Sequence, residues 1–174
     1  MHMIPSFLNP SEVLKHLELS EEMIAADFGA GSGGWAIPLA KKLEEGKVYA
    51  IDILEEPLSA LKDRAKLEGI SNIATIKSDV EKGVDVSSES CDVVLITNLL
   101  FQVEDKKSVL KEGKRVLRPE GKILVVDWRI DSPLGPRDGR VSSKEVKEIA
   151  EEVGLKVEEE FEAGPYHWGL IFKH

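Results

Sequence analysis

A glycine-rich turn between a short apolar segment and a segment with helical periodicity most constrains the fold of this chain. The run AADFGAGSGGW, residues 25–35, places an acid, Asp27, just before a series of glycines. Residues 23–28 read as a short buried strand, and residues 37–43 carry helix periodicity. Glycines at such a joint permit positive φ angles and let a ligand approach the backbone closely. The turn therefore predicts a site for a nucleotide-like ligand.

Two kinds of ligand are consistent with glycines at this spacing. Gly29, Gly31 and Gly34 match the G-x-G-x-x-G pattern that seats a dinucleotide pyrophosphate on a helix N-terminus. Asp27 stands two residues before the first of them, where its negative charge is poorly placed for a pyrophosphate. The same charge suits a ligand that bears an ammonium group, such as S-adenosylmethionine. A glycine turn without any ligand is the structural alternative.

Length and composition predict a single globular domain. The chain has 174 residues, of which 42% are hydrophobic and 32% charged, enough for a sizeable core and a soluble surface. No apolar stretch could span a bilayer and no signal peptide is recognised, so we expect no membrane insertion and a cytoplasmic location. The net charge of −9 disfavours general nucleic-acid binding. The lone Cys91 excludes an internal disulfide and is expected in the core.

Strands and helices alternate along the chain, which predicts a parallel sheet covered on both faces. The predicted strands are residues 23–28, 47–51, 73–77, 91–97, 122–128, 155–161 and 167–173. The predicted helices are residues 9–17, 37–43, 57–69, 104–117 and 142–154. A turn at 119–121 leads into the fifth strand, and Gly164 and Pro165 join the last two strands as an antiparallel hairpin.

Several motifs occur together in the order found in class I S-adenosylmethionine-dependent methyltransferases. The D-x-G-x-G-x-G string at residues 27–33 resembles motif I of that class. CDVVLITNLLFQVED, residues 91–105, and RVLRPEGKILVVDW, residues 115–128, resemble segments of the ubiquinone and menaquinone biosynthesis methyltransferases, the type 11 branch. Glu120 replaces the usual first glycine of the second segment, a tolerable change in an exposed turn. The matches together cover residues 25–128.

The resemblance implies a Rossmann-like, doubly wound α/β fold. Its seven-stranded sheet would have the order 3-2-1-4-5-7-6 with strand 7 antiparallel, and the predicted terminal hairpin agrees with this. Residues 1–174 would form one methyltransferase domain. Within it, 1–22 would be an N-terminal helical segment, 23–130 the cofactor-binding core, and 131–174 a loop, a helix and the hairpin.

The resemblance also implies S-adenosylmethionine as cofactor, with S-adenosylhomocysteine as product. Asp52 closes the second strand, where an acid accepts hydrogen bonds from both ribose hydroxyls, unless it caps a loop. Asp79 follows the third strand, where it would accept from the adenine amino group, unless it is a solvated turn acid. Ile53 would pack on the adenine or in the core. The predicted cofactor-binding residues are Asp27, Phe28, Gly29, Ala30, Gly31, Gly33, Asp52, Ile53, Asp79, Val80 and Asn98.

Three residues are candidates for a direct part in methyl transfer. Asn98 ends the fourth strand and could hold the substrate or the cofactor's ammonium through its side-chain carbonyl, with a helix cap as the alternative. Asp127 closes the fifth strand and could act as a base, bind a cationic substrate, or be structural. His167 begins the last strand, where a near-neutral pKa would suit proton removal, although a packed aromatic cluster with its neighbours is the favoured interpretation.

The sequence does not identify the methyl acceptor, which could be a small molecule or an exposed macromolecular group. No cluster of Cys, His and acidic residues has metal-ligand spacing, so no metal is predicted. Residues 1–19 and the loop 131–140 alone remain to cover the substrate side, which predicts a large substrate or closure by another subunit. Arg129, Arg137 and Arg140 would attract an anionic substrate there, or form a solvated loop.

Two other functions remain open. One is a catalytically silent subunit that binds the cofactor and supports a partner enzyme. The other is a nicotinamide-dependent oxidoreductase, which Asp27, Asp79 and the terminal hairpin oppose. Residues 99–101, Leu-Leu-Phe, do not match the N-P-P-Y motif of adenine amino-group methyltransferases, so that substrate class is set aside.

Overall fold

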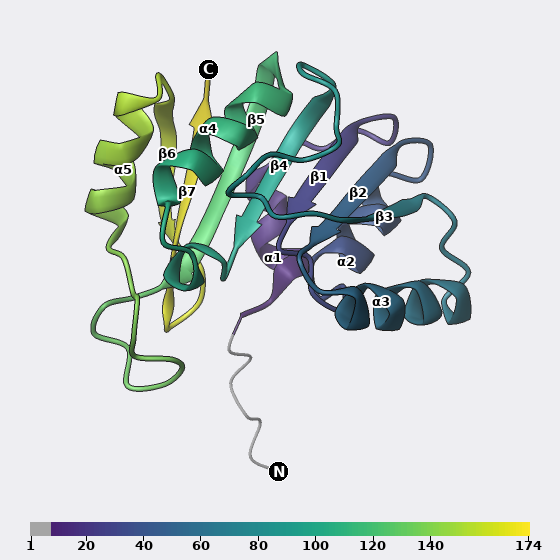
Figure 1. The fold of residues 1–174 in the computed structure, drawn as a ribbon, viewed down its shortest axis with the longest axis horizontal. Coiled ribbons are helices and arrows are strands. Elements are labelled where there is room, and N and C mark those ends of the chain that lie inside the picture. Colours follow the sequence, from purple (N-terminus) through teal and green to yellow (C-terminus); the bar gives the residue numbers. More distant parts are fainter. Residues whose placement is uncertain (1–7) are drawn as a thin grey trace.

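A computed structural model describes residues 8–174. The first part of the predicted N-terminal segment, residues 1–7, therefore lies outside the described residues. Seven strands form one sheet between two layers of helices (Figure 1). The strands are β1 (Ile24–Phe28), β2 (Lys47–Asp52), β3 (Ile73–Lys77), β4 (Cys91–Thr97), β5 (Leu117–Trp128), β6 (Lys156–Glu162) and β7 (His167–Lys173). The helices are α1 (Pro10–Val13), α2 (Ala36–Lys42), α3 (Glu55–Leu67), α4 (Lys106–Val116) and α5 (Ser143–Glu152), with short 3₁₀ helices η1 (Leu14–His16) and η2 (Leu100–Gln102).

The strand order is β3-β2-β1-β4-β5-β7-β6, as predicted. The first five strands are parallel, and β7 runs antiparallel to both β5 and β6. β1 pairs with β2 on one side and with β4 on the other, so the strand order reverses direction between β1 and β4. In open α/β sheets, ligands bind beyond the carboxyl ends of the strands at such a reversal. The fold therefore directs attention to the end of β1.

Alternate side chains of the strands feed two separate apolar cores. One core packs α4 and α5 against the sheet through buried residues such as Val109, Leu110 and Val146. The other packs α1, α2 and α3 through Val13, Ile37 and other buried side chains. Cys91 is fully buried, as its expected core role requires. Among the helices of residues 8–174, none is long and apolar enough to cross a membrane.

Most predicted bounds agree with the structure to within two residues, and three of the differences have a clear local cause. The predicted helix over 9–17 is a single α-turn that tightens into η1. The helix predicted from residue 104 begins at Lys106, because the Asp105 side chain accepts a hydrogen bond from Ser108 N–H and caps it. The predicted turn at 119–121 is instead part of β5, where the register against β4 shifts between Cys91 and Val93. The division of the domain after residues 22 and 130 stays a prediction.

Candidate functional site

The glycine turn after β1 requires positive φ angles, and its amides serve mainly the protein itself. Gly29, Gly31 and Gly33 have φ angles of 73°, 55° and 99°, a region that favours glycine. The N–H groups of Gly29 and Ala30 both donate to the carbonyl of Ile51, each at 2.8 Å. These two amides are therefore not free for a ligand, contrary to the simplest interpretation of the motif. A pyrophosphate would find fewer donors here than the G-x-G-x-x-G pattern suggests.

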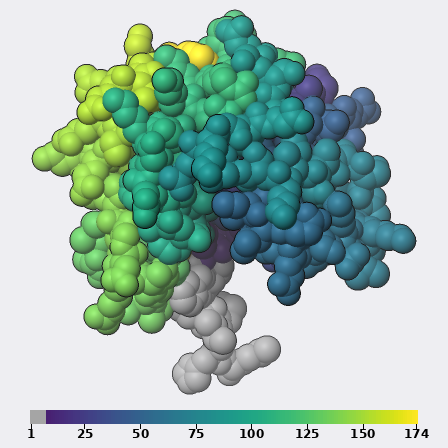
Figure 2. Space-filling view, viewed as in Figure 1, coloured from purple at the N-terminus to yellow at the C-terminus, as the bar shows by residue number. Residues whose placement is uncertain are grey.

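A cavity of about 390 Å³ opens beside this turn. It is lined by Gly29, Gly31, Asp52, Ile53, Leu54, Pro57, Ser78, Asp79, Val80, Glu81, Leu99, Gln102 and Val103. Figure 2 shows the blue surface of the β2–α3 region meeting the teal surface of later segments on the face in view. The cavity thus brings together the ends of β1, β2, β3 and β4, four adjacent strands, as a cofactor site in this kind of sheet requires.

Asp52 is the half-buried acid that organises one wall of the cavity. Its Oδ2 accepts the N–H of Gly31 at 2.9 Å, and its Oδ1 accepts the N–H of Leu54 at 3.0 Å. Each carboxylate oxygen has two acceptor positions, so both can take a further donor. Asp52 does cap a loop, but it retains the capacity to bind two hydroxyls.

The far end of the cavity combines an acid with apolar walls. Asp79 accepts the N–H of Glu81 through Oδ1 at 2.9 Å and lines the cavity. Val80 is buried there in the core that also holds Val103. Ile53 is 57% exposed, so core packing is excluded for it and the cavity wall is its place in the described structure. This end suits a flat ring with an exocyclic amino group.

Asp27 and Asn98 carry buried side-chain oxygens that lack a hydrogen-bond donor among residues 8–174. Asp27 is 1% exposed, and neither of its carboxylate oxygens has a hydrogen-bond partner among residues 8–174. Burial, and secondarily the charge of Asp52, raises the pKa of Asp27 to about 8. Asn98, at the end of the neighbouring strand with φ 50°, likewise has a buried Oδ1 unpartnered in the described residues. A helix-cap role for Asn98 is excluded, since η2 has no side-chain cap.

Unpartnered acceptors of this kind indicate a missing donor. Leaving a buried acceptor unsatisfied costs about 1–3 kcal/mol, and more for a charged group. Two of these oxygens belong to Asp27 on β1 and one to Asn98, directly after the adjacent strand β4. A group with several N–H donors and a positive charge would satisfy acceptors of this kind.

Asp127 is fully buried but well partnered. Its Oδ1 accepts the N–H of Trp128 at 2.8 Å, and its Oδ2 accepts the N–H of Phe101 at 3.4 Å. Burial raises its pKa to about 6, although these backbone donors oppose the rise. The carboxylate thereby ties the end of β5 to η2, which favours the structural alternative.

His167 lies across from Trp128 in the pairing of β5 with β7, and the two ring centroids are 4.2 Å apart. It is 1% exposed, and no group of residues 8–174 hydrogen-bonds either ring nitrogen. Burial lowers its pKa to about 4, so the expected near-neutral pKa is wrong. The imidazole is neutral at pH 7. The ring packs against Trp128 of β5 at an interplanar angle of 37°, whereas the cluster with its chain neighbours stays a prediction.

We expect the buried His167 to make the protein sensitive to acid. Its pKa is lowered in the folded state, so the unfolded chain takes up its proton first and stability falls as pH drops from about 6.5 toward 4. His167→Phe should remove this pH dependence. When the pH is lowered from 7 to 4.5, the free energy of unfolding of the variant should rise by about 1–2 kcal/mol relative to that of the wild type. Urea unfolding at both pH values measures the difference. The half-exposed His16, bonded to Glu159, supplies the control His16→Phe, and an equal gain there would contradict the assignment.

The loop after β5 is held by Arg140, a role that the sequence did not suggest. Its guanidinium donates to the carbonyls of Ile130, Ser132, Leu134, Gly135 and Pro136 at 2.6–3.4 Å. Arg129 pairs with Asp131 at 3.1 Å. Two of the three arginines expected to attract an anion are therefore committed to the loop itself. A β-carbon on Gly135 would lie 2.5 Å from the Trp128 ring, so the loop packs closely on that ring.

Sequence reasoning missed several cavity residues. Leu99 and Gln102 line the cavity, and a β-carbon on Gly29 would lie 2.8 Å from the Leu99 side chain. Their position directly after β4 was the available signal, because residues there face the carboxyl edge of the sheet. Trp35, which ends the glycine turn, is 8% exposed and belongs to the core that packs α1, α2 and α3. No group of three or more His, Cys, Asp or Glu in the described part of the chain is placed to hold a metal.

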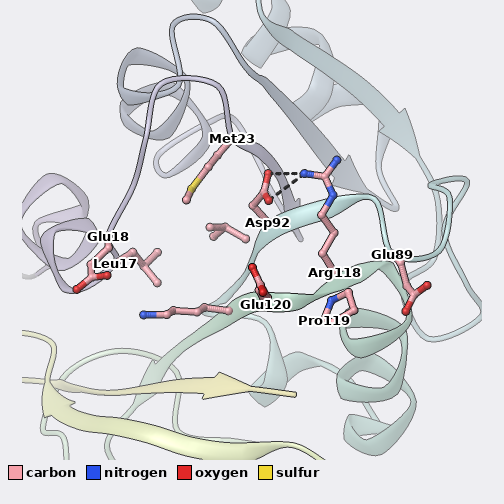
Figure 3. A pocket seen from close by; sticks show the side chains of 10 residues that line it. Leu17, Glu18, Met23, Glu89, Asp92, Arg118, Pro119 and Glu120 are labelled. Carbon is pink, nitrogen blue, oxygen red and sulfur yellow. Dashed lines mark hydrogen bonds and ion pairs between the residues drawn. The ribbon is translucent and has the colours of Figure 1, made fainter.

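A larger cavity of about 600 Å³ lies at the opposite edge of the sheet (Figure 3). It is lined in part by Leu17, Met23 and Glu120. Arg118 pairs there with Asp92 at 2.9 Å, and Asp92 also accepts the N–H of Ile24. This cavity has no glycine turn and sits where strands begin. The smaller cavity is the candidate site because it lies at the carboxyl ends of the strands, although it is not the largest.

This sheet order, with an acid before a glycine turn at the strand reversal, defines a class I S-adenosylmethionine-dependent methyltransferase, and comparison with known proteins agrees. A family model described as a methyltransferase domain matches residues 19–167. The chain belongs to this methyltransferase domain family, and the recognition of the type 11 branch is confirmed.

Similar solved structures and curated relatives are also methyltransferases. A SAM-dependent methyltransferase from Aquifex aeolicus is 29% identical, with a TM-score of 0.88 over 95% of this chain and 89% of that one. A type 11 methyltransferase from Sulfolobus solfataricus is 28% identical, with a TM-score of 0.77 over 97% and 94%. The demethylmenaquinone methyltransferase of Bacillus mycoides is 28% identical over 75% of this chain and 55% of that enzyme. The Geobacillus stearothermophilus enzyme of that name is 32% identical over 63% and 47%. The chain thus spans about half the length of these two relatives.

Proposed function

We propose that this protein is an enzyme that transfers a methyl group from S-adenosylmethionine to a nucleophilic acceptor. The observation that carries the proposal is the set of unpartnered acceptor oxygens on Asp27 and Asn98 beside the glycine turn. An ammonium group supplies the donors that these oxygens lack. The pyrophosphate of a dinucleotide would instead meet negative charge and few free amides, which counts against the oxidoreductase alternative.

The ribose and adenine parts of the cofactor also have proposed partners. Asp52 would accept both ribose hydroxyls while it still holds the amides of Gly31 and Leu54. Asp79 would accept from the adenine amino group, and the backbone N–H of Val80 would donate to the ring. Ile53 and other apolar residues of the cavity wall would cover the ring faces.

When bound, S-adenosylmethionine supplies an electrophilic methyl carbon, so the protein mainly has to orient the acceptor and exclude water. Orientation of this kind contributes about 7–11 kcal/mol to catalysis. A base is needed only if the acceptor arrives protonated. Of the three candidates, Asn98 keeps an unused acceptor oxygen, whereas both oxygens of Asp127 are engaged and the His167 ring is enclosed beside Trp128. We therefore assign contact with ligand or acceptor to Asn98 and structural roles to Asp127 and His167.

The proposed methyl acceptor comes from the names of the relatives, because the residues of the site do not identify it. Relatives named demethylmenaquinone methyltransferases make demethylmenaquinone the first acceptor to try. A silent cofactor-binding subunit would bind the same ligand but transfer no methyl group. A cytoplasmic location, and coverage of the site by either a large acceptor or a second subunit, are further parts of the proposal.

Calorimetric titration with S-adenosylhomocysteine, with NAD alongside, tests the cofactor. We expect saturable, one-to-one binding of S-adenosylhomocysteine and no heat from NAD. Transfer of radiolabelled methyl from S-adenosylmethionine to the trial acceptor then separates an enzyme from a silent subunit. Binding of NAD in place of S-adenosylhomocysteine would overturn the proposal.

A further inference from the structure

We propose that the cofactor site exchanges a proton for its ligand: the amino-acid end of S-adenosylmethionine or S-adenosylhomocysteine binds only as Asp27 gives up a proton. The inference rests on the proposed function and concerns the regulation of that same site by pH. It stands on the placement of a carboxyl group that is wholly enclosed, unpartnered and next to a second acid.

The surroundings of Asp27 explain why the free protein keeps the proton. The carboxyl is 1% exposed, and no donor from residues 8–174 reaches either oxygen. An ionised carboxylate in such a place lacks both water and hydrogen bonds, so the neutral form is favoured. The pKa of about 8 reflects this burial, and at pH 7 most free molecules carry the protonated acid.

The charged groups near Asp27 act in the same direction. On β2, Asp52 adds a negative charge, which is the one electrostatic partner that raises the pKa of Asp27. On β4, whose Leu95 pairs with Asp27, the last residue Thr97 is uncharged, and so is Asn98 directly after it. The glycine turn and α2 bring no charge before Lys41 within the described chain. No neighbouring cation thus stabilises the carboxylate until a ligand provides one.

A bound ammonium group reverses the balance. It brings a full positive charge and three N–H donors to the three unpartnered oxygens of Asp27 and Asn98. The carboxylate form of Asp27 is then strongly favoured over the neutral acid. One proton consequently leaves the protein for each ligand bound at pH 7. Below about pH 8, affinity should rise with pH, by up to tenfold per unit, and then level off, because Asp27 is already ionised in the free protein.

The decisive experiment is titration calorimetry of the wild-type protein with S-adenosylhomocysteine at pH 7 in phosphate and in Tris. These buffers differ in ionisation enthalpy, so the difference in heat counts the protons released. We expect a release approaching one proton per ligand at pH 7. A ligand amine that took up a proton would give the opposite sign. The probe 5′-methylthioadenosine keeps the adenosine but lacks the ammonium group, and we expect it to release no proton.

Variants assign the proton to Asp27. Asp27→Asn imitates the protonated acid, and it should bind S-adenosylhomocysteine at least about tenfold more weakly, release no proton and bind 5′-methylthioadenosine as the wild type does. Asp52→Asn should move the pH at which affinity levels off to a lower value. Asp63→Asn, an exposed acid on α3, is the matched control and should behave as the wild type.

The outcomes separate this inference from the function on which it rests. Binding of S-adenosylhomocysteine with no proton released, or with the same release in Asp27→Asn, overturns the proton exchange and leaves the methyltransferase proposal standing. Failure of both S-adenosylhomocysteine and 5′-methylthioadenosine to bind overturns the proposed function itself. The wild-type buffer comparison decides the question even if Asp27→Asn does not fold.

Discussion

Replacing Asp52 by Ala should lower the affinity for S-adenosylhomocysteine by about 100-fold. A hydrogen bond to a charged group contributes roughly 1.5–3 kcal/mol, and two ribose hydroxyls would lose this partner. The variant also frees the amides of Gly31 and Leu54, which loosens the wall against which the ligand rests. Titration calorimetry on both proteins measures the ratio of dissociation constants.

The control for this variant is Glu56→Ala, which removes the same charge from an exposed position in the first turn of α3. It should change the affinity less than twofold. Asp52→Asn keeps oxygen and nitrogen atoms in place of the carboxylate and should fall between Asp52→Ala and the wild type. An Asp52→Ala protein that unfolds normally and binds within threefold of the wild type would show that the ribose lies elsewhere.

The second large effect is on stability, at Gly46 in the turn between α2 and β2. A β-carbon there would overlap the backbone carbonyl of Met23, and it would lie 3.1 Å from that of Glu21. Backbone atoms at the entry to β1 cannot move aside as a flexible side chain could. Gly46→Ala should therefore cost about 2–3 kcal/mol of unfolding free energy and lower the Tm by about 4–12 °C.

Gly34→Ala is the matched control for this prediction. A β-carbon on Gly34 would meet no atom within 4 Å, and the residue has no positive φ angle, so the change should stay within about 0.5 kcal/mol. Urea unfolding of the wild type and both variants gives the comparison. Equal stability of Gly46→Ala and Gly34→Ala would mean that the α2–β2 turn does not pack against the carbonyl of Met23.

The strand positions were predictable because each apolar run is short and bounded by clear stops. That pattern also placed Asp52 and Asp79 at the carboxyl edge, since an acid directly after a buried strand has to emerge there. What the sequence does not contain is the partner of each polar group. The amides of Gly29 and Ala30 are used by Ile51, a residue of the next strand, and only the folded sheet brings them together.

The same limit explains why the pKa of His167 and the role of Arg140 could not be predicted from the sequence. The pKa of His167 depends on how completely its neighbours enclose it, which no local pattern reports. Arg140 looked like a free cation at the mouth of the site, yet the loop before it folds so that five carbonyls converge on its guanidinium. Loop geometry of this kind follows from turns and contacts that single-residue preferences do not specify.

The hydrogen bonds of Arg140 bear on how the domain could accommodate different methyl acceptors. A loop that is already ordered by a side chain at its own end loses little conformational entropy when a ligand contacts it. The loop is also largely self-contained, because the hydrogen bonds of Arg140 close within residues 130–140. Its supports outside that range include Arg129, which bonds Asp131 and Ser132, the Trp128 ring beside Gly135, and the Phe101 carbonyl beside Gly139. Such a segment can be exchanged for another of similar length while the sheet and the cofactor contacts stay as they are. Diversification of acceptor choice would then proceed by substitution of one compact module rather than by remodelling of the domain.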